Sequence, residues 1–555
     1  MNISMTRRNT IIGVVVVCAV GASAWGLNGT GASKSARRSA VPTRLGPNDA
    51  NAPVADVAVE RTNATKQQRI LTRSSRAASL SGSVTHLVAA AKHPHRQNAE
   101  NDHFIGQQGG DSFTDTTAAS PSATNTPVRT SPNPLISFAG LNFSQDGNGW
   151  PPDTTGDIGP NHYIQTVNTA IGIFDKTNGA RLASFSYDTF FNGTGTPCDN
   201  NNGGDPTVVY DHYSSRWIIG DFAWIGATGP YYECVAVSKT ADPVNGGWWQ
   251  YGILVDNVNF NDYPKMAVWP SGIFITYNLF PDAGGYAGPQ ISALNRTDLI
   301  NGNPVSIVSF RPGSQYNSML AATARATDPP ANTNEYAVTL ETTSLNLWRF
   351  HVDFATPANS TLTGPQIVPV ATYATRPRVA TRGGETVDTL SDRLMDHLAY
   401  SNVNNTPSLW TTHTVYSAKR ESLRWYQITG IDATPTLTQQ STYSAAGNRW
   451  MPSMAVDHTG DMALGYTVGG ATIYPSIRYD GRLVSDATNT LAQGETTLIA
   501  GTGSQSGGFH RWGDYSSMNI DPADGCTFWY TTEYYIVKGS NWQTRIGAFK
   551  FPSCS

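Results

Sequence analysis

Met451-Pro-Ser-Met-Ala-Val-Asp457 is one copy of a pattern that recurs along the chain. The pattern opens with a variable residue and then Pro or Ser, continues as a largely apolar run, and ends at a turn. The other clear copies are Asp205-Pro-Thr-Val-Val-Tyr-Asp211, Tyr263-Pro-Lys-Met-Ala-Val-Trp269 and Tyr515-Ser-Ser-Met-Asn-Ile-Asp521. A second β-rich run follows each turn, as in Met462–Thr467, so each copy predicts a β-hairpin.

Weaker copies begin near residues 157, 319 and 396, and no long amphipathic helix lies between any of the copies. Seven units of roughly 50–65 residues, each with room for three or four strands, predict an all-β fold, a seven-bladed β-propeller. A tandem of β-sandwiches is the alternative. Because a propeller must close its ring, we expect the last strand, Arg545–Phe551, to share a blade with Ile136–Phe143.

The first 135 residues differ from the rest. Arg7 and Arg8 precede the apolar run Ile11–Val20, and Ala22-Ser23-Ala24 offers a cleavage site, so residues 1–24 are predicted to be a signal peptide. Residues 25–135 are poor in aromatic side chains and are predicted to be a spacer or pro-segment outside the core, with Leu71–Leu87 able to form one short helix. Residues 136–555 then form the propeller, and we expect a secreted protein, extracellular or periplasmic.

Composition and charge exclude several classes of protein. Charged residues make up 14% of the chain, and 52 Gly and 33 Pro indicate a turn-rich β protein. Residues 136–555 carry 23 Lys and Arg against 34 Asp and Glu, a balance unsuited to nucleic-acid binding. The sequence has no phosphate-binding loop, zinc-protease motif or dinucleotide fingerprint. We expect a monomer with no stable membrane anchor.

Four cysteines remain after removal of the signal peptide: Cys198, Cys234, Cys526 and Cys554. An even number in an exported protein predicts two disulfides, with three possible pairings. Sequence proximity favours Cys198–Cys234 and Cys526–Cys554, and the second would hold the closing strand.

The starts of the repeated runs supply the candidate site. The first strand of each propeller blade lines the central channel, so the residues at its start meet at one mouth. At that position stand Asp157, Asp205, Asp262, Asp396, Arg449 and Asp514, and beside it lie Tyr263, Arg393, His397, Trp450, Arg511, Trp512 and Tyr515. An Asp at the start of a strand also serves as a structural cap, which is the alternative for each of these acids.

The stretch Pro152-Asp153-Thr-Thr-Gly-Asp157-Ile-Gly-Pro-Asn-His162-Tyr163 resembles parts of secreted bacterial β-propellers of the sialidase-like class. The resemblance covers about residues 140–555 and is one of architecture. The Arg-Ile-Pro segment of sialidases has a loose counterpart in Arg449-Trp450-Met451-Pro452, and Asp521–Trp529 departs from their Asp-box in its Asp-to-Gly spacing. The resemblance implies Tyr263 or Tyr515 as a nucleophile and Arg393, Arg449 and Arg511 as a clamp for a sugar carboxylate.

Three functions follow from these residues. The first, which we favour, is hydrolysis of an extracellular polysaccharide or glycoconjugate, acidic ones included, with Asp205 or Asp262 as acid or base, Asp396 and Asp514 as further carboxylates, and Trp450 and Trp512 against the sugar. The second is a uronate lyase in which His397 or a tyrosine abstracts a proton. The third is a non-catalytic propeller that binds a glycan or a protein and holds Ca²⁺ in its channel. No other cofactor is expected.

Overall fold

The computed structural model describes residues 58–61, 67–87, 130–226 and 228–555. Every described residue belongs to one compact unit, which lies within residues 53–555. The predicted signal peptide therefore lies outside the described residues, as does most of the predicted spacer. The described helices are the α-helices α1 (Tyr187–Phe191) and α2 (Arg296–Ile300) and the 3₁₀ turns η1 (Val84–His86) and η2 (Pro357–Asn359). None of these has the length and hydropathy to cross a membrane.

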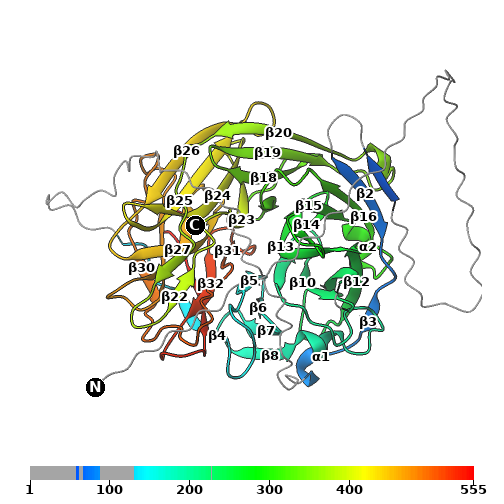
Figure 1. Ribbon diagram of the computed structural model, residues 1–555, viewed down its shortest axis with the longest axis horizontal. Coiled ribbons are helices and arrows are strands. Elements are labelled where there is room, and N and C mark those ends of the chain that lie inside the picture. The colour runs from blue at the N-terminus through cyan, green and yellow to red at the C-terminus, as the bar shows by residue number, and fades with distance from the viewer. Residues whose placement is uncertain (1–57, 62–66, 88–129, 227) are drawn as a thin grey trace, which may run out of the picture. The chain divides into compact units, whose positions relative to one another are not determined.

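The rest of the regular structure is β, and it forms a closed ring of antiparallel strand groups (Figure 1). The first strand of each group contacts the first strand of the next, and the last contacts the first, which is the arrangement of a β-propeller. The fold class expected from the sequence is confirmed. These inner strands are β5 (Thr155–Ile158), β9 (Thr207–Asp211), β13 (Asn259–Trp269), β17 (Met319–Ala324), β23 (Met395–Val403), β27 (Asn448–Val456) and β31 (Ser517–Ile520).

The outer strands follow their inner strand along the chain. The first three groups add β6 (His162–Val167), β7 (Ala170–Asp175), β8 (Arg181–Ser186), β10 (Arg216–Trp224), β11 (Tyr231–Ser238), β12 (Trp248–Asp256), β14 (Gly272–Pro281), β15 (Gly288–Leu294) and β16 (Ser306–Arg311). The next two add β18 (Glu335–Glu341), β19 (Ser344–His351), β20 (Thr361–Pro369), β24 (Thr406–Ser417), β25 (Arg420–Thr429) and β26 (Thr436–Tyr443). The sixth adds β28 (Met462–Gly469), β29 (Ser476–Arg482) and β30 (Thr496–Ile499). A separate hairpin, β21 (Arg378–Ala380) and β22 (Thr386–Asp388), precedes β23.

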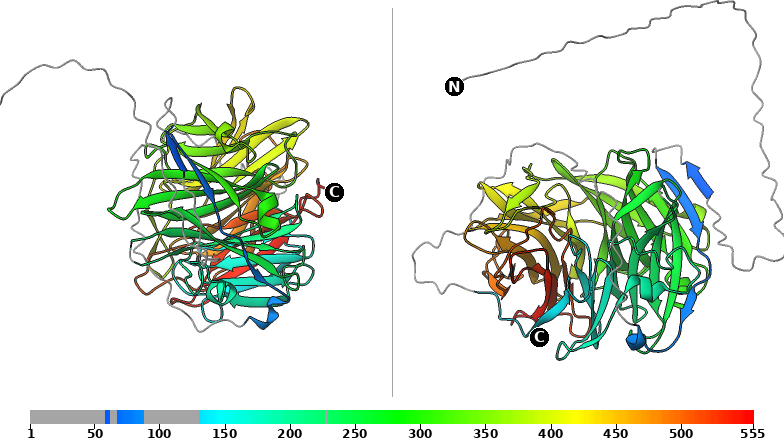
Figure 2. Two further views of the ribbon diagram at one scale, coloured as in Figure 1. Left: turned by 90° about the vertical axis from the view of Figure 1, so that its right-hand side faces the viewer. Right: turned by 60° about the horizontal axis from the view of Figure 1, so that its bottom comes forward.

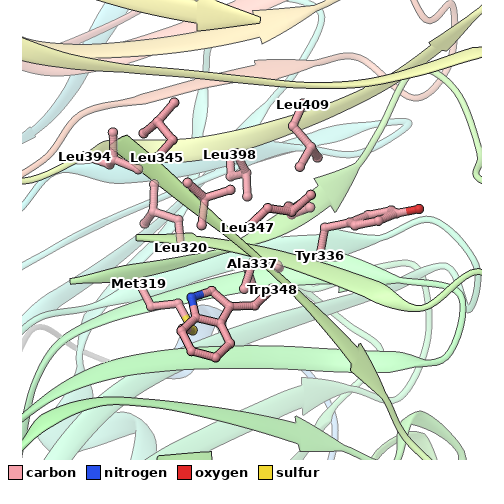
Figure 3. Packing of buried hydrophobic residues seen from close by; sticks show 14 of the residues in the cluster. Met319, Leu320, Tyr336, Ala337, Leu345, Leu347, Trp348, Leu394, Leu398 and Leu409 are labelled. Carbon is pink, nitrogen blue, oxygen red and sulfur yellow. The ribbon is translucent and has the colours of Figure 1, made fainter. Parts of the chain in front are cut away.

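Two neighbouring groups are continuous, because β17 and β23 pair in parallel and produce one eight-stranded sheet. Figure 3 shows the apolar core that spans this junction, with Leu320 of β17, Leu347 of β19, Leu398 of β23 and Leu409 of β24 in one cluster. Leucine side chains on facing strands thus bury the junction. Since the two groups are not separate sheets, the count of seven separate blades stays a prediction.

The ring closes as the sequence predicts. Strand β33 (Gln543–Phe549) pairs with β4 (Ile136–Asn142), next to β32 (Phe528–Tyr534) and β31, and Ile546 lies opposite Phe138. The structure contains the disulfides Cys526–Cys554 and Cys198–Cys234, the two pairings that sequence proximity favours.

Part of the predicted spacer belongs to the propeller. In the outer strap, residues 67–87, strand β2 (Gln68–Arg73) pairs with β16 and β3 (Ala78–Leu80) pairs with β12, while β1 (Ala58–Arg61) pairs with β2 (Figure 2). Within Leu71–Leu87 the only helical residues are the short 3₁₀ turn η1, and strands take up much of the rest. The exclusion of this segment from the core is wrong, since Val84 is fully buried. The physical reason is tertiary: β12 and β16 would otherwise be exposed edges, and pairing satisfies their backbone groups.

Candidate active site

The starts of the inner strands meet at one end of the ring, because all the inner strands run in the same direction. Electrostatic interactions join the side chains found there: Asp205 interacts with Asp262, Asp514 and Lys265, and Lys265 also interacts with Asp396. We call Asp153, Asp205, Asp262, Asp396, Asp514 and Lys265 the acidic cluster. The structure therefore brings together the four acids that the sequence proposes as catalytic and adds Asp153 and Lys265.

The backbone at these strand starts repeats one conformation. Asp153, Asp205, Tyr263, Met451 and Asp514 all adopt left-handed φ angles, between 51° and 55°. Aspartate tolerates this region, so part of the recurrence of Asp has a backbone cause, whereas the same conformation costs a bulky residue about 1–3 kcal/mol. Side chains of the preceding group hold the conformation: the Asp205 amide donates to Asn168 Oδ1 (3.0 Å) and the Tyr263 amide donates to Asp205 Oδ2 (3.1 Å).

Lys265 is the residue that sequence reasoning missed. Its ammonium lies 3.4 Å from the centroid of the Tyr263 ring and 3.8 Å from that of Tyr515, and it donates to the carbonyl of Pro264 (2.9 Å). Burial lowers the pKa of Lys265 to about 8, against the opposite effect of the surrounding carboxylates. A lone lysine inside the apolar run Tyr263–Trp269 was the available signal, because an unpaired ammonium is rarely buried.

Asp205 has the environment of a carboxyl group that keeps its proton. Burial, with the nearby charges of Asp262 and Asp514, raises its pKa to about 7. The neighbouring Asp153 side chain acts in the opposite direction and lowers the pKa of Asp205. Asn168 Nδ2 fixes Asp153 by donating to Oδ2 (2.7 Å).

Asp262 is the half-buried member of this group. Burial raises its pKa and Asp514 raises it further, whereas Arg393, Lys265 and Arg511 oppose the shift. None of the described residues donates a hydrogen bond to its carboxylate. Asp262 therefore combines access from outside with a raised pKa and unused acceptor capacity.

The two arginines at this end of the ring are already engaged. Arg511 bridges two carboxylates, with Nε 2.6 Å from Asp388 Oδ2 and one terminal nitrogen 2.6 Å from Asp514 Oδ1. Arg393 pairs with Asp392 through two contacts of 3.2 Å and lies over the Tyr263 ring. Asp388 ends β22, so the inserted hairpin supplies one anchor of Arg511.

Three residues expected to bind substrate are packed as structural residues. Arg449 makes a two-pronged ion pair with Glu495 (2.7 and 2.8 Å), and Trp450 and Trp512 are fully buried against each other. Their predicted substrate-binding role does not fit this burial. Asp157, which the sequence also places at the mouth, is buried in an ion pair with Arg325.

His397 lies deeper in the channel. Its Nδ1 is 3.0 Å from Asp396 Oδ1 and its Nε2 is 3.3 Å from Ser517 Oγ. Together with Arg325, Tyr400, Met454 and residues of β31 it lines a small cavity. His397 is thus held by two neighbours along the inner strands.

Tyr263 and Tyr515 are poor nucleophiles in this setting. Burial raises the pKa of both phenols well above the ordinary value, and neighbouring carboxylates raise it further. The Tyr515 hydroxyl donates to the carbonyl of Pro206 (3.1 Å). The two rings enclose the Lys265 ammonium instead.

No protein-family model matches the chain, and no curated protein matches it. Several solved structures match the chain at low similarity. A protein of unknown function from Dyadobacter fermentans matches with a TM-score of 0.34 and 10% identity over 62% of this chain and 94% of that one. A Hadza microbial sialidase matches with a TM-score of 0.33 and 9% identity, over 72% of this chain and 66% of that one. An exo-β-1,3-galactanase from Phanerochaete chrysosporium matches with a TM-score of 0.30 and 10% identity, over 75% of this chain and 100% of that one. Similarity at this level does not transfer an activity to this chain.

Proposed function

We propose that this protein is a glycan-cleaving enzyme of the hydrolase type that works outside the cytoplasm, with Asp262 as the proton donor and Asp514 as the base or nucleophile. The observation that carries the proposal is the contrast between these two acids. Asp262 has a raised pKa and no hydrogen-bond donor among the described residues, whereas the Arg511 guanidinium stabilises the negative charge of Asp514. Two interacting carboxyl groups with opposed environments are the usual arrangement for glycoside hydrolysis.

Asp205 is a positioning residue: its Oδ2 accepts a hydrogen bond from the amide of Tyr263, the residue after Asp262. The charges of Asp262 and Asp514 raise the pKa of Asp205, so it keeps its proton beside them. The two alternative functions fit less well. A uronate lyase needs arginines free to neutralise the sugar acid, and a channel Ca²⁺ would compete with the Lys265 ammonium for the same carboxylates. The two disulfides are compatible with an extracellular protein.

The test is product release from a panel of polysaccharides by the full chain, with reducing-end and unsaturated-product readouts run together. We expect reducing ends without unsaturated products, and a loss of 10²–10⁴-fold in Asp262→Asn and in Asp514→Asn. Asp457→Asn is the matched control, because Asp457 is also a buried acid with a raised pKa but lies at the turn after β27. Unsaturated products would favour the lyase. If no polymer gives any product, the remaining function is that of a binding protein.

A further inference from the structure

Every permanent cation of the site already has acidic partners. Arg511 is held by Asp388 and Asp514, and Arg393 by Asp392. Lys265 is 4% exposed and its ammonium is enclosed by two tyrosine rings, so it is not available to a ligand from outside. Among the described residues of this site, no lysine or arginine is left over for a sugar carboxylate.

The carboxyl groups outnumber these cations. Asp153, Asp205, Asp262, Asp388, Asp392, Asp396 and Asp514 stand against Lys265, Arg393 and Arg511. A proton held by Asp205 removes one negative charge, which still leaves an excess. Interactions between charges are stronger in a poorly solvated site than in water, so the excess acts on any ligand there.

The hydrogen-bond acceptors of the site also favour a ligand that carries no negative charge and donates hydrogen bonds. Asp262 is half-buried, and none of the described residues donates a hydrogen bond to its carboxylate. A buried acceptor without a donor costs about 1–3 kcal/mol, so a ligand that donates hydrogen bonds here is stabilised relative to one that only accepts them.

We propose that the site accepts glycans without acidic groups, and that it favours neutral sugars and sugars that carry an ammonium group. A hydroxyl or an ammonium donates to the carboxylates, whereas a uronate carboxylate would meet surplus negative charge and no unpaired guanidinium. This inference rests on the proposed function, and it reverses the arginine clamp for acidic sugars that the resemblance implies.

The test compares polymers that differ in charge on the same backbone: β-1,4-mannan with polymannuronate, cellulose oligomers with their uronate counterparts, and chitin oligomers with chitosan oligomers. Cleavage and retardation in affinity gels are measured with the full chain. We expect neutral or amino polymers to be bound and cut at least tenfold better than their uronate partners, a ratio that shrinks as salt is added. Equal or better binding of uronates overturns the inference, as does no binding at all. If a neutral polymer is bound but not cut, and its uronate partner is bound at least tenfold less well, the inference about charge is supported and the proposed hydrolase activity is contradicted.

A variant makes the test sharper. Asp392→Asn removes the carboxylate that engages Arg393 and keeps a side chain of the same shape. We expect it to gain at least tenfold in retardation by polymannuronate, while Asp457→Asn behaves like the wild type. A folded Asp392→Asn protein with no gain contradicts the inference. Where its thermal unfolding shows that the variant does not fold, the wild-type comparison of matched polymers decides alone.

Discussion

The Lys265 ammonium lies 3.4 Å from the centroid of the Tyr263 ring, inside a ring of carboxylates that come from separate strand groups. Both residues belong to β13, two positions apart, at an irregularity of the strand where Tyr263 has a left-handed φ of 55°. Tyr515 also contacts the ammonium, with its ring centroid 3.8 Å away. A single lysine thus supplies the internal charge on which the acidic cluster depends.

Lys265→Met should therefore destabilise the fold. Removing the cation leaves buried carboxylates without their counter-charge, and breaking a buried pair in this way typically costs about 3–5 kcal/mol. Urea unfolding at neutral pH measures the loss. Lys239→Met is the matched control, since Lys239 also lies over an aromatic ring, that of Trp249 (4.1 Å), but is half-buried, so its removal should cost about 1 kcal/mol or less. Equal effects of the two substitutions would show that the cluster does not need the charge.

The raised pKa of Asp205 makes the fold less stable at higher pH. The unfolded carboxyl loses its proton near pH 4, whereas the folded one keeps it to about pH 7, so between these values the folded state binds more protons and stability falls as pH rises. The wild type should lose about 2 kcal/mol more than Asp205→Asn between pH 5 and pH 7. Asp524→Asn is the control, because the pKa of Asp524 is lowered and its effect lies at more acidic pH. Parallel stability curves for wild type and Asp205→Asn would contradict the assignment.

Arg449 should prove structural. Arg449→Met leaves Glu495 without its two-pronged partner, so we expect a clear drop in melting temperature but unchanged kcat/KM for the folded enzyme. Arg511→Met, which releases Asp388 and Asp514, should lose activity. Steady-state kinetics well below the melting temperature separate the two effects. A raised KM in Arg449→Met would restore the substrate-binding role that the sequence implies.

The outer strap should stabilise the propeller without taking part in the site. Val84→Asp places a charge where the side chain is fully buried, next to blade strands rather than strand starts, and should lower the melting temperature and expose the strap to proteolysis. Thr85→Asp, at an exposed neighbouring position, is the control. Activity of the folded fraction should be unchanged in both. If Val84→Asp unfolds no earlier than the control, the strap is not part of the stable fold.

The hairpin pattern predicts the propeller because each apolar run with its turn is a local unit, and the closure of β33 with β4 follows from the need to close a ring. The strap could not be predicted in this way. Its sequence has few apolar residues, and its strands exist because distant strands offer free edges to pair with.

The candidate site also has a part that the sequence predicts and a part that depends on tertiary contacts. Equivalent strand starts identify Asp205, Asp262, Asp396 and Asp514, since topology alone brings them together. Whether the other predicted residues can reach a substrate depends on burial and ion pairing. Trp450 and Trp512 are fully buried, and Arg449 forms an ion pair with Glu495. Lys265 was missed because it stands on the strand itself, among residues that look like core.

The pH dependence of kcat/KM on the polysaccharide that is cut fastest tests whether Asp262 is the proton donor. Asp262 must be protonated to donate, so activity should fall on the alkaline side. Arg393→Met should move that fall to higher pH, because it removes a positive charge that lowers the pKa of Asp262. Asp457→Asn should leave the profile in place. An alkaline fall at the same pH in wild type and Arg393→Met, or no such fall at all, would contradict the assignment of Asp262 as the proton donor.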